Sequence, residues 1–222
     1  MIIGYFGVPG VGKTTVLTSI AQKELKKISK GKSKYSHVLT NFECSGCSKI
    51  NFSDIGVYDI QNSLILLDEI TVDADNRDFK NFKKSSVEGF VYHRHYDLDI
   101  IYATQQFDAV DKKIRNLTFS LWCMKSGYVL PVTKCKRVFR VTDINEVTND
   151  LVLGYRFADF KEVLISLFLP TKLKITQRIW RPPFYKFFDS KSKPLHLLPF
   201  NYQSWDELKP KPFSIGKSPP SG

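Results

Sequence analysis

The chain has 222 residues, a length that suits one α/β domain with a small appendage. Its hydrophobic share of 42% and aromatic share of 14% exclude a disordered chain. The formal net charge of +11 favours a polyanionic partner, either nucleic acid or an anionic membrane surface. A generally basic protein that binds neither of them specifically is the alternative.

The sequence shows no secretory leader, because Met1 opens directly into an apolar run with no basic segment or cleavage site. The longest late apolar run, residues 163–169, is far too short to span a bilayer. We therefore expect a cytoplasmic protein with free thiols, and a membrane-associated one if the native chain continues past residue 222.

Apolar strands alternate with helices through the first 125 residues, a pattern typical of a mostly parallel sheet with crossover helices. The expected strands are residues 1–6, 38–42, 63–67, 98–103 and 117–124. The expected helices are residues 13–28, 83–95 and 108–115.

The pattern changes after this core. Residues 136–141 alternate between polar and apolar side chains, which indicates antiparallel hairpins added to the sheet. Residues 176–190 are basic, aromatic and broken by proline. The residues that we expect to contact DNA, a neighbouring subunit or a membrane surface are Lys172, Lys174, Arg178, Trp180, Arg181, Tyr185 and Lys186. The predicted division is a core over 1–125, a hairpin and basic-aromatic extension over 126–205, and a disordered Pro/Lys/Ser tail over 206–222.

A glycine-rich stretch, GVPGVGKTT, lies between the first strand and the first helix. It matches G-x-x-x-x-G-K-[ST] and has the required strand before it and helix after it. Glycines allow backbone N–H groups to turn inward around phosphates, and the helix N-terminus adds its dipole. The predicted ATP-binding residues are Gly7, Pro9, Gly10, Val11, Gly12, Lys13, Thr14 and Thr15.

Two residues of this stretch have specific roles in such a site. Lys13 places a positive charge on the β- and γ-phosphates. The Thr14 hydroxyl completes the coordination of Mg²⁺. The expected cofactors are therefore ATP and Mg²⁺.

The apolar strand at residues 63–67 ends in two carboxylates. Asp68 is predicted to hold the Mg²⁺ together with Thr14, and Glu69 is predicted to polarise the attacking water. A kinase has little use for the second carboxylate, whereas a hydrolase requires it. The alternative for this pair is a cap for the following helix.

A later strand, residues 98–103, is followed by Thr104 and Gln105. Polar residues at the carboxyl end of a strand lie where α/β sheets bind their ligands. We expect Gln105, or Thr104, to sense the γ-phosphate or orient water; an ordinary polar strand end is the alternative.

Three quoted segments carry a resemblance to a known family. They are YHRHYDLDII at residues 92–101, TQ at 104–105 and VDKKIR at 110–115. With the glycine-rich stretch they resemble the zonular occludens toxin family, which includes the gene I assembly proteins of filamentous phages. This family is similar to the wider FtsK/HerA group of DNA-pumping P-loop ATPases. The resemblance covers residues 1 to 120 and weakens through the hairpins.

The resemblance implies a ring of subunits with ATP at each interface and an arginine of the neighbour reaching into it. Arg94 and Arg115 are the candidates for this arginine, and Arg77 is a weaker one. The alternative for Arg94 is an intramolecular ion pair with Asp97 or Asp99. Proteins of this family usually carry a membrane-spanning helix after the ATPase domain.

The cysteines form one CxxC, Cys44 and Cys47, with Cys123 and Cys135 as separate thiols. One CxxC is half of a zinc site, and neither the spacing of the other two cysteines nor any histidine spacing supplies the second half. Inert thiols are the expectation, with zinc or redox chemistry as alternatives.

The sequence thus predicts a three-layer α/β P-loop domain with a mostly parallel sheet and a small antiparallel extension. Its expected function is an oligomeric ATPase that moves DNA in the assembly, extrusion or packaging of a virus or phage, in the cytoplasm of the host. Its expected partners are DNA, further copies of the chain in a ring, and membrane or virion-assembly components. The alternatives are a P-loop kinase and a non-pumping interaction protein.

Overall fold

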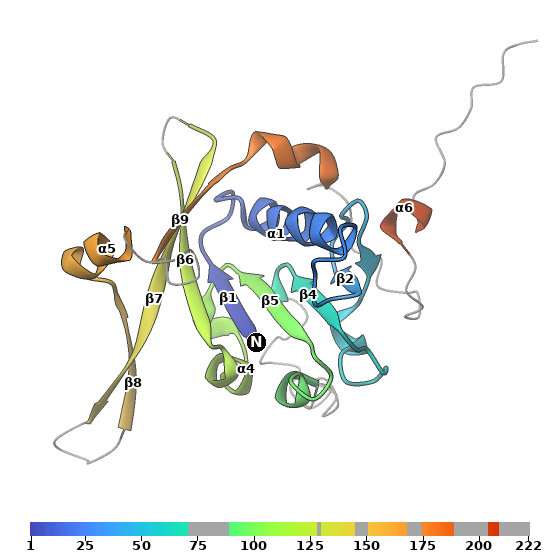
Figure 1. Ribbon diagram of the computed structural model, residues 1–222. Helices are drawn as coiled ribbons and strands as arrows, with labels where there is room; N and C mark the ends of the chain where they lie inside the picture. The colour runs from blue at the N-terminus through green and yellow to red at the C-terminus, as the bar shows by residue number, and fades with distance from the viewer. Residues whose placement is uncertain (71–88, 128–129, 145–150, 168–174, 189–203, 209–222) are drawn as a thin grey trace, which may run out of the picture.

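The structure is a computed structural model that describes residues 1–70, 89–127, 130–144, 151–167, 175–188 and 204–208. Within these residues one sheet organises the chain. The strand order is β3-β2-β4-β5-β1-β6-β7-β8, and β9 pairs with β7. Figure 1 shows this sheet with helices on both of its faces.

Six strands run parallel and form the core of the sheet. They are β1 (Ile2–Phe6), β2 (His37–Thr40), β3 (Ser48–Lys49), β4 (Ser63–Leu67), β5 (Asp99–Thr104) and β6 (Ser120–Ser126). In β4 and β5 every residue is buried, as expected for strands covered on both faces.

Alternate residues of these strands enter two separate hydrophobic clusters. Leu64 and Leu66 of β4 pack on the side of helix α1 (Lys13–Ile28), whereas Ile65 and Leu67 pack on the opposite side with Phe90. The period of two along a strand explains this division.

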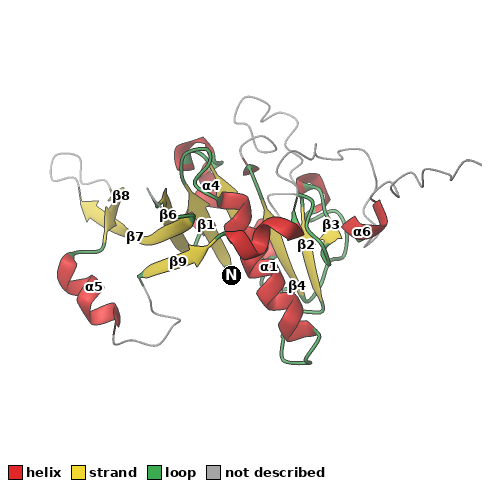
Figure 2. Cartoon of the chain, turned by 90° about the horizontal axis from the view of Figure 1, so that it is seen from above, coloured by secondary structure: helices red, strands yellow, loops and turns green. Residues whose placement is uncertain are grey.

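Helices cover both faces of the sheet. Helix α1 lies over one face, and α4 (Lys112–Leu117) with the helical residues 89–92 lies over the other (Figures 1 and 2). Short 3-10 turns complete the connections: η1 (Phe52–Asp54) and η3 (Phe107–Ala109). The three-layer arrangement predicted from the sequence is therefore confirmed.

The antiparallel part begins where β6 meets β7 (Val132–Ile144). Strands β8 (Leu151–Phe157) and β9 (Thr176–Trp180) both pair antiparallel with β7. The β7–β8 hairpin projects from the parallel sheet on the side opposite β3, with α5 (Phe160–Leu167) beside it (Figure 1). The antiparallel extension predicted from the alternation at residues 136–141 is confirmed.

Segments at both ends of the sheet differ from the sequence-based boundaries. The helix expected over 83–95 is helical at 89–92 and continues as turns at 93–97, while 83–88 lie outside the described residues. Strand β3 and helix α6 (Trp205–Leu208) were not predicted. Residues 206–208 of the expected tail belong to α6, and residues 209–222 lie outside the described part of the chain.

The strand order decides where the predicted site residues lie. Strand β5 is inserted between β1, which leads into the glycine-rich stretch, and β4, which ends at Asp68. The carboxyl ends of parallel strands meet at one edge of a sheet. Gln105 therefore follows a strand that lies between the two halves of the expected site.

Candidate nucleotide site

The glycine-rich stretch, hereafter the P-loop, connects β1 to α1 through two left-handed glycines. Gly10 has φ +79° and Gly12, the residue before α1, has φ +93°. These values are costly for residues with a Cβ, so glycine is required for the path of the loop. Pro9 is exposed at the tip of the loop, whereas Val11 and Thr15 are buried.

Lys13 begins helix α1 and is almost fully buried, with 6% of its side chain exposed. Its Nζ donates to the carbonyl of Gly7 at 3.1 Å and lies 3.3 Å from Oε1 of Glu69. The ammonium therefore bridges the first residue of the P-loop and the carboxylate that follows β4. Two residues 56 positions apart in the sequence are brought into contact.

Thr14 and Asp68 form the second link between the P-loop and β4. The Thr14 hydroxyl donates to Oδ2 of Asp68 at 2.5 Å. Burial raises the pKa of the Asp68 carboxyl above its ordinary value; the bond from Thr14 opposes this, and the negative charge of Glu69 adds to it. A half-buried carboxylate and a hydroxyl at this separation are oxygen donors of the kind that Mg²⁺ prefers.

Asn41, the first residue after β2, fixes the backbone of Asp68. Its side-chain Oδ1 accepts from the Asp68 N–H at 2.7 Å, and its Nδ2 donates to the Asp68 carbonyl at 2.9 Å. The sequence analysis assigned no role to this asparagine. Its position directly after a strand that ends beside β4 was the feature of the sequence that could have indicated a place in the site.

Glu69 has a left-handed backbone with φ +50°, an uncommon conformation for a residue with a long side chain. Its N–H donates to Oδ1 of Asp68 at 3.1 Å. This turn directs consecutive carboxylates to different partners, Asp68 to Thr14 and Glu69 to Lys13.

Gln105 is exposed directly after β5. Its neighbour Thr104 is buried: the hydroxyl donates to the Gln106 carbonyl at 3.0 Å, and the Thr104 carbonyl accepts from the Gly7 N–H at 3.2 Å. Of the two residues proposed as sensors, only Gln105 presents its side chain to solvent at this edge.

The antiparallel extension also contacts the P-loop, which the sequence did not predict. The Thr133 hydroxyl of β7 donates to the Val11 carbonyl at 2.6 Å. Arg181, the residue after β9, places Nη1 3.3 Å from the Gly10 carbonyl oxygen. These pairs are 122 and 171 residues apart, so no local pattern could have revealed them.

The first candidate for the neighbour's arginine, Arg115, is held within its own chain. Its Nη1 lies 3.2 Å from Oδ1 of Asp108, and its guanidinium stacks 5.9 Å from the Phe107 ring centre. Its Nε is buried with no hydrogen-bond partner among the described residues. Its backbone carbonyl accepts from Arg140 at 2.7 Å.

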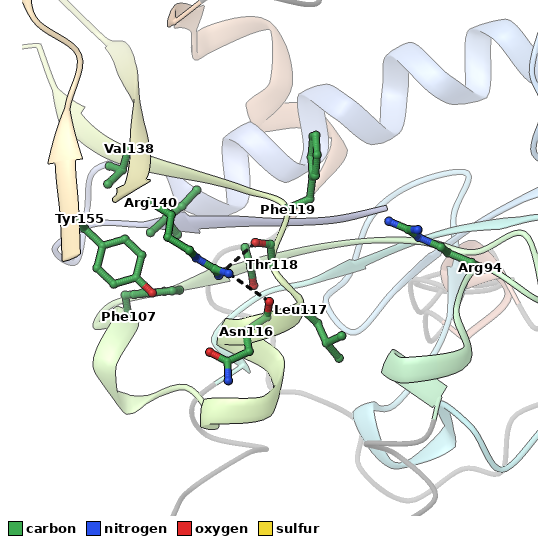
Figure 3. Close-up of a pocket in the computed structure, with 10 residues that line it drawn as sticks. Arg94, Phe107, Asn116, Leu117, Thr118, Phe119, Val138, Arg140 and Tyr155 are labelled. Carbon is green, nitrogen blue, oxygen red and sulfur yellow. Dashed lines mark hydrogen bonds between the residues drawn. The ribbon is translucent and has the colours of Figure 1, made fainter. Parts of the chain in front are cut away.

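The other candidate, Arg94, is exposed and lies five residues before β5 begins. Figure 3 shows it at one end of a cavity of about 300 Å³, apart from Arg140 and Tyr155 at the other end. The alternative of an ion pair with Asp99 is not seen, because Asp99 contacts the Met1 amino group, Lys34 and Tyr35. Among the described residues no ion pair joins Arg94 to Asp97 either.

The position of Arg94 separates it from the P-loop of its own chain. It precedes β5, whereas the P-loop lies at the carboxyl ends of the strands. Six residues of strand span roughly 20 Å. Arg94 therefore lies away from the P-loop of its own chain. Arg77, the weaker candidate, lies outside the described residues.

The cysteines are distributed over distant strands. Cys44 and Cys47 lie in the connection from β2 to β3, whereas Cys123 and Cys135 lie on β6 and β7. Strands β2 and β6 are four steps apart in the sheet, roughly 19 Å. A zinc site made from all four thiols is therefore incompatible with the fold.

In the described part of the chain no helix is both long and apolar enough to cross a membrane.

The family model for zonular occludens toxin (Zot) matches residues 14–121. No curated protein matches the sequence. Among solved structures, the N-terminal domain of zonular occludens toxin from Neisseria meningitidis is similar at 18% identity and a TM-score of 0.47. The similarity covers 72% of this chain and 95% of that one.

Two further solved structures are similar at lower identity. The genome packaging NTPase B204 from Sulfolobus turreted icosahedral virus 2, in complex with ATP-gammaS, shares 12% identity at a TM-score of 0.40, over 58% of this chain and 76% of that one. The KaiC-like protein PH0186 from Pyrococcus horikoshii OT3 shares 10% identity at a TM-score of 0.41, over 69% and 88%.

The family match covers the segment that joins the P-loop threonine to β6 and includes Asp68, Glu69, Arg94 and Gln105. The resemblance inferred from the sequence motifs is thereby confirmed: residues 14–121 of this chain match the zonular occludens toxin family model.

Proposed function

We propose that the protein is an ATP-hydrolysing, oligomeric motor that moves DNA during the assembly, extrusion or packaging of a virus or phage. One observation carries the enzymatic part of this proposal. The P-loop and the end of β4 are joined by two direct contacts, Lys13 to Glu69 at 3.3 Å and Thr14 to Asp68 at 2.5 Å. The groups proposed to bind phosphate, to hold the metal and to activate water are thus in direct contact at one edge of the sheet.

The roles follow from the chemistry of each group. Residues 7–15 surround the phosphates of ATP, with Lys13 supplying positive charge. Thr14 and Asp68 hold Mg²⁺, which when bound neutralises charge on the phosphates. Asn41 fixes the Asp68 backbone so that the carboxylate stays directed at Thr14.

Glu69 is the proposed general base, and Gln105 the proposed sensor of the γ-phosphate. In this structure Glu69 is paired with Lys13. Lys13 has to direct its charge to the phosphates when ATP binds, which releases the Glu69 carboxylate to accept a proton from water.

The motor part of the proposal rests on the family match, the net charge of +11 and the position of Arg94. A cation that cannot reach its own P-loop is suited to complete the site of a neighbouring subunit, where it stabilises charge on the transferred phosphoryl group. Arg94 is preferred over Arg115, because Arg115 is already paired with Asp108. The proposed location is the host cytoplasm, with membrane or virion-assembly components as further partners.

The test is the ATPase rate of the full chain without DNA, with single-stranded DNA and with double-stranded DNA, alongside sedimentation to measure the oligomer. The expected result is an oligomer whose rate rises with one of the two DNA forms. A monomer whose rate is unchanged by either form contradicts the motor.

Substitution of the base separates hydrolysis from phosphoryl transfer. Glu69→Gln should lower phosphate release by about a hundredfold or more while ATP still binds. Asp59→Asn, which changes an exposed carboxylate that contacts Gln61, is the matched control and should release phosphate at the wild-type rate. Undiminished phosphate release by Glu69→Gln would remove Glu69 from the mechanism.

A further inference from the structure

Arg181 is placed on the P-loop by the antiparallel extension. Its backbone N–H donates to the Pro131 carbonyl at 3.0 Å, which fixes the chain where it leaves β9. Its side chain then runs to the loop, with Nη1 3.3 Å from the Gly10 carbonyl oxygen and Nη2 3.4 Å from the Ser126 hydroxyl. The position is therefore set at both the backbone and the guanidinium.

The stem of Arg181 packs closely against Gly12. A Cβ at Gly12 would lie 2.8 Å from Cδ of Arg181 and 2.7 Å from Oγ1 of Thr133. Real Cβ atoms do not approach other atoms so closely. The absence of a side chain at Gly12 is what allows the arginine to lie along the loop.

The charge of Arg181 is not matched by any acidic group in the part of the chain that the structure describes. No carboxylate of the described residues forms an ion pair with it, whereas Lys13 is paired with Glu69. Its Nε is buried and has no hydrogen-bond partner among these residues. Its two side-chain hydrogen bonds to described residues, at 3.3 and 3.4 Å, are long for a charged donor.

We propose that Arg181 binds the phosphate groups of the nucleotide held by the P-loop of its own chain. The inference rests on the proposed function, since it assumes that the P-loop binds a nucleoside triphosphate. The planar guanidinium presents paired donors that match two phosphate oxygens, and Arg181 has donors to spare beyond its two weak contacts. The site then combines Lys13 and Arg181 from one chain with an arginine from a neighbour.

Nucleotide titrations test the charge directly. Arg181→Ala and Arg181→Lys are compared with the wild type for binding of fluorescent ATP, ADP and AMP. Arg181→Ala should weaken ATP by about tenfold and AMP much less, because the lost donors face the added phosphates. Arg181→Lys should retain part of the affinity, since a lysine keeps the charge but not the paired donors.

Arg156→Ala is the matched control, because Arg156 is an exposed arginine of the antiparallel extension that lies on β8 and pairs with Glu162. It should bind all three nucleotides as the wild type does. Equal weakening of ATP and AMP by Arg181→Ala would show that the residue only braces the loop. Unchanged ATP affinity would likewise overturn the proposal.

A mixing experiment decides whether Arg181 acts within its own chain. Lys13→Ala cannot bind nucleotide productively. In a mixed oligomer of Lys13→Ala and Arg181→Ala, each subunit that keeps Lys13 therefore lacks its own Arg181. No recovery of hydrolysis is expected from this mixture, whereas Lys13→Ala mixed with Arg94→Ala should recover activity at mixed interfaces. Recovery in the Arg181 mixture would assign the residue to a neighbour's site.

Failure of the proposed function has a different signature. If the wild type binds ATP but does not hydrolyse it, the ATPase proposal fails, while the titrations still decide the role of Arg181. If the wild type hydrolyses ATP and Arg181→Ala binds it equally well, only the inference about Arg181 fails.

Discussion

At the scale of single residues, Gly12 is the position where the P-loop tolerates least change. It combines φ +93° with close contacts from Thr133 and Arg181. We predict that Gly12→Ala abolishes measurable ATP binding and lowers the free energy of unfolding by about 2 kcal/mol or more, because strain and overlap act together. Urea denaturation and nucleotide titration measure the two effects.

Gly31→Ala provides the control for this substitution. Gly31 also has a left-handed backbone, φ +63°, but a Cβ there would meet nothing within 4 Å. Gly31→Ala should lower the free energy of unfolding by only about 1 kcal/mol, from backbone strain alone, and leave ATP binding intact. Equal costs at the two glycines would contradict the close approach of the extension to the P-loop.

Asn41 is predicted to support the metal side of the site through the backbone of Asp68. Asn41→Ala removes two hydrogen bonds, each worth about 1 kcal/mol, so unfolding should be easier by about 2 kcal/mol. The Mg²⁺ concentration needed for half-maximal ATPase activity should also rise, because the Asp68 carboxylate is less well directed at Thr14.

The exposed Asn116 on α4 serves for comparison. Asn116→Ala should change the unfolding free energy by less than about 0.5 kcal/mol. Asn41→Asp should not restore the wild-type behaviour, because a carboxylate accepts from the Asp68 N–H but cannot donate to its carbonyl. An unaltered Mg²⁺ requirement in Asn41→Ala would confine Asn41 to a structural role.

At the scale of elements, the sequence predicted those whose signals are local. Helix α1 and strand β4 occur at the residues expected for them, since glycines precede the helix and a continuous apolar run forms the strand. The P-loop, Asp68 and Glu69 were named from the same kind of signal, and the structure brings them together. Their catalytic roles remain predictions.

Elements and contacts that depend on distant partners were not foreseen. Strand β3 has two residues and α6 has four, too few for a periodic pattern. Asn41, Thr133 and Arg181 reach the site only because the sheet order places β2, β7 and β9 around β1, β4 and α1. Such partners follow from topology rather than from neighbouring residues.

Helix α6 is predicted to stabilise the edge of the sheet at β2 and β3 through Trp205. This side chain is 4% exposed, and its Nε1 donates to the Thr40 hydroxyl at 2.8 Å. Trp205→Phe should cost about 1 kcal/mol for the lost hydrogen bond, and Trp205→Ala about 3 to 5 kcal/mol for the lost packing.

Trp180 on β9 is a matched tryptophan, with 48% exposure. Trp180→Ala should cost less than about 1 kcal/mol in the same urea denaturation. If Trp205→Ala cost no more than Trp180→Ala, docking of α6 on this edge would not contribute to stability.

At the scale of the whole molecule, the carboxyl ends and the amino ends of the parallel strands carry different groups of residues. The carboxyl edge gathers the P-loop, Asn41 and the pair Asp68–Glu69, and the extension reaches it through Arg181. The amino edge places Arg94 away from this site. In the proposed motor, Lys13 and Arg181 contact the phosphates of their own chain's nucleotide, and Arg94 contacts the nucleotide of a neighbouring subunit.

The amino edge also contains the ion cluster that links the start of the chain to β5. Asp99 accepts from the Met1 amino group, from Lys34 Nζ at 2.8 Å and from the Tyr35 hydroxyl. Burial by itself would raise the pKa of the Asp99 carboxyl, but these three donors together lower it to about 2. The carboxyl is 12% exposed, so solvent screens these contacts only weakly.

This cluster predicts how stability depends on pH. The unfolded Asp has a pKa of about 3.9, so the folded state binds protons less readily, and the contribution is fully present above about pH 5. It should be lost as the pH falls toward 2, with a total of about 2.5 kcal/mol. Asp99→Asn should be less stable than the wild type at pH 7, and the difference should shrink as the pH falls from 5 to 2. The stability of Asp59→Asn, which alters an exposed carboxylate, should match that of the wild type at every pH. A constant difference in stability between Asp99→Asn and the wild type across this range would show that the three donors do not lower the Asp99 pKa.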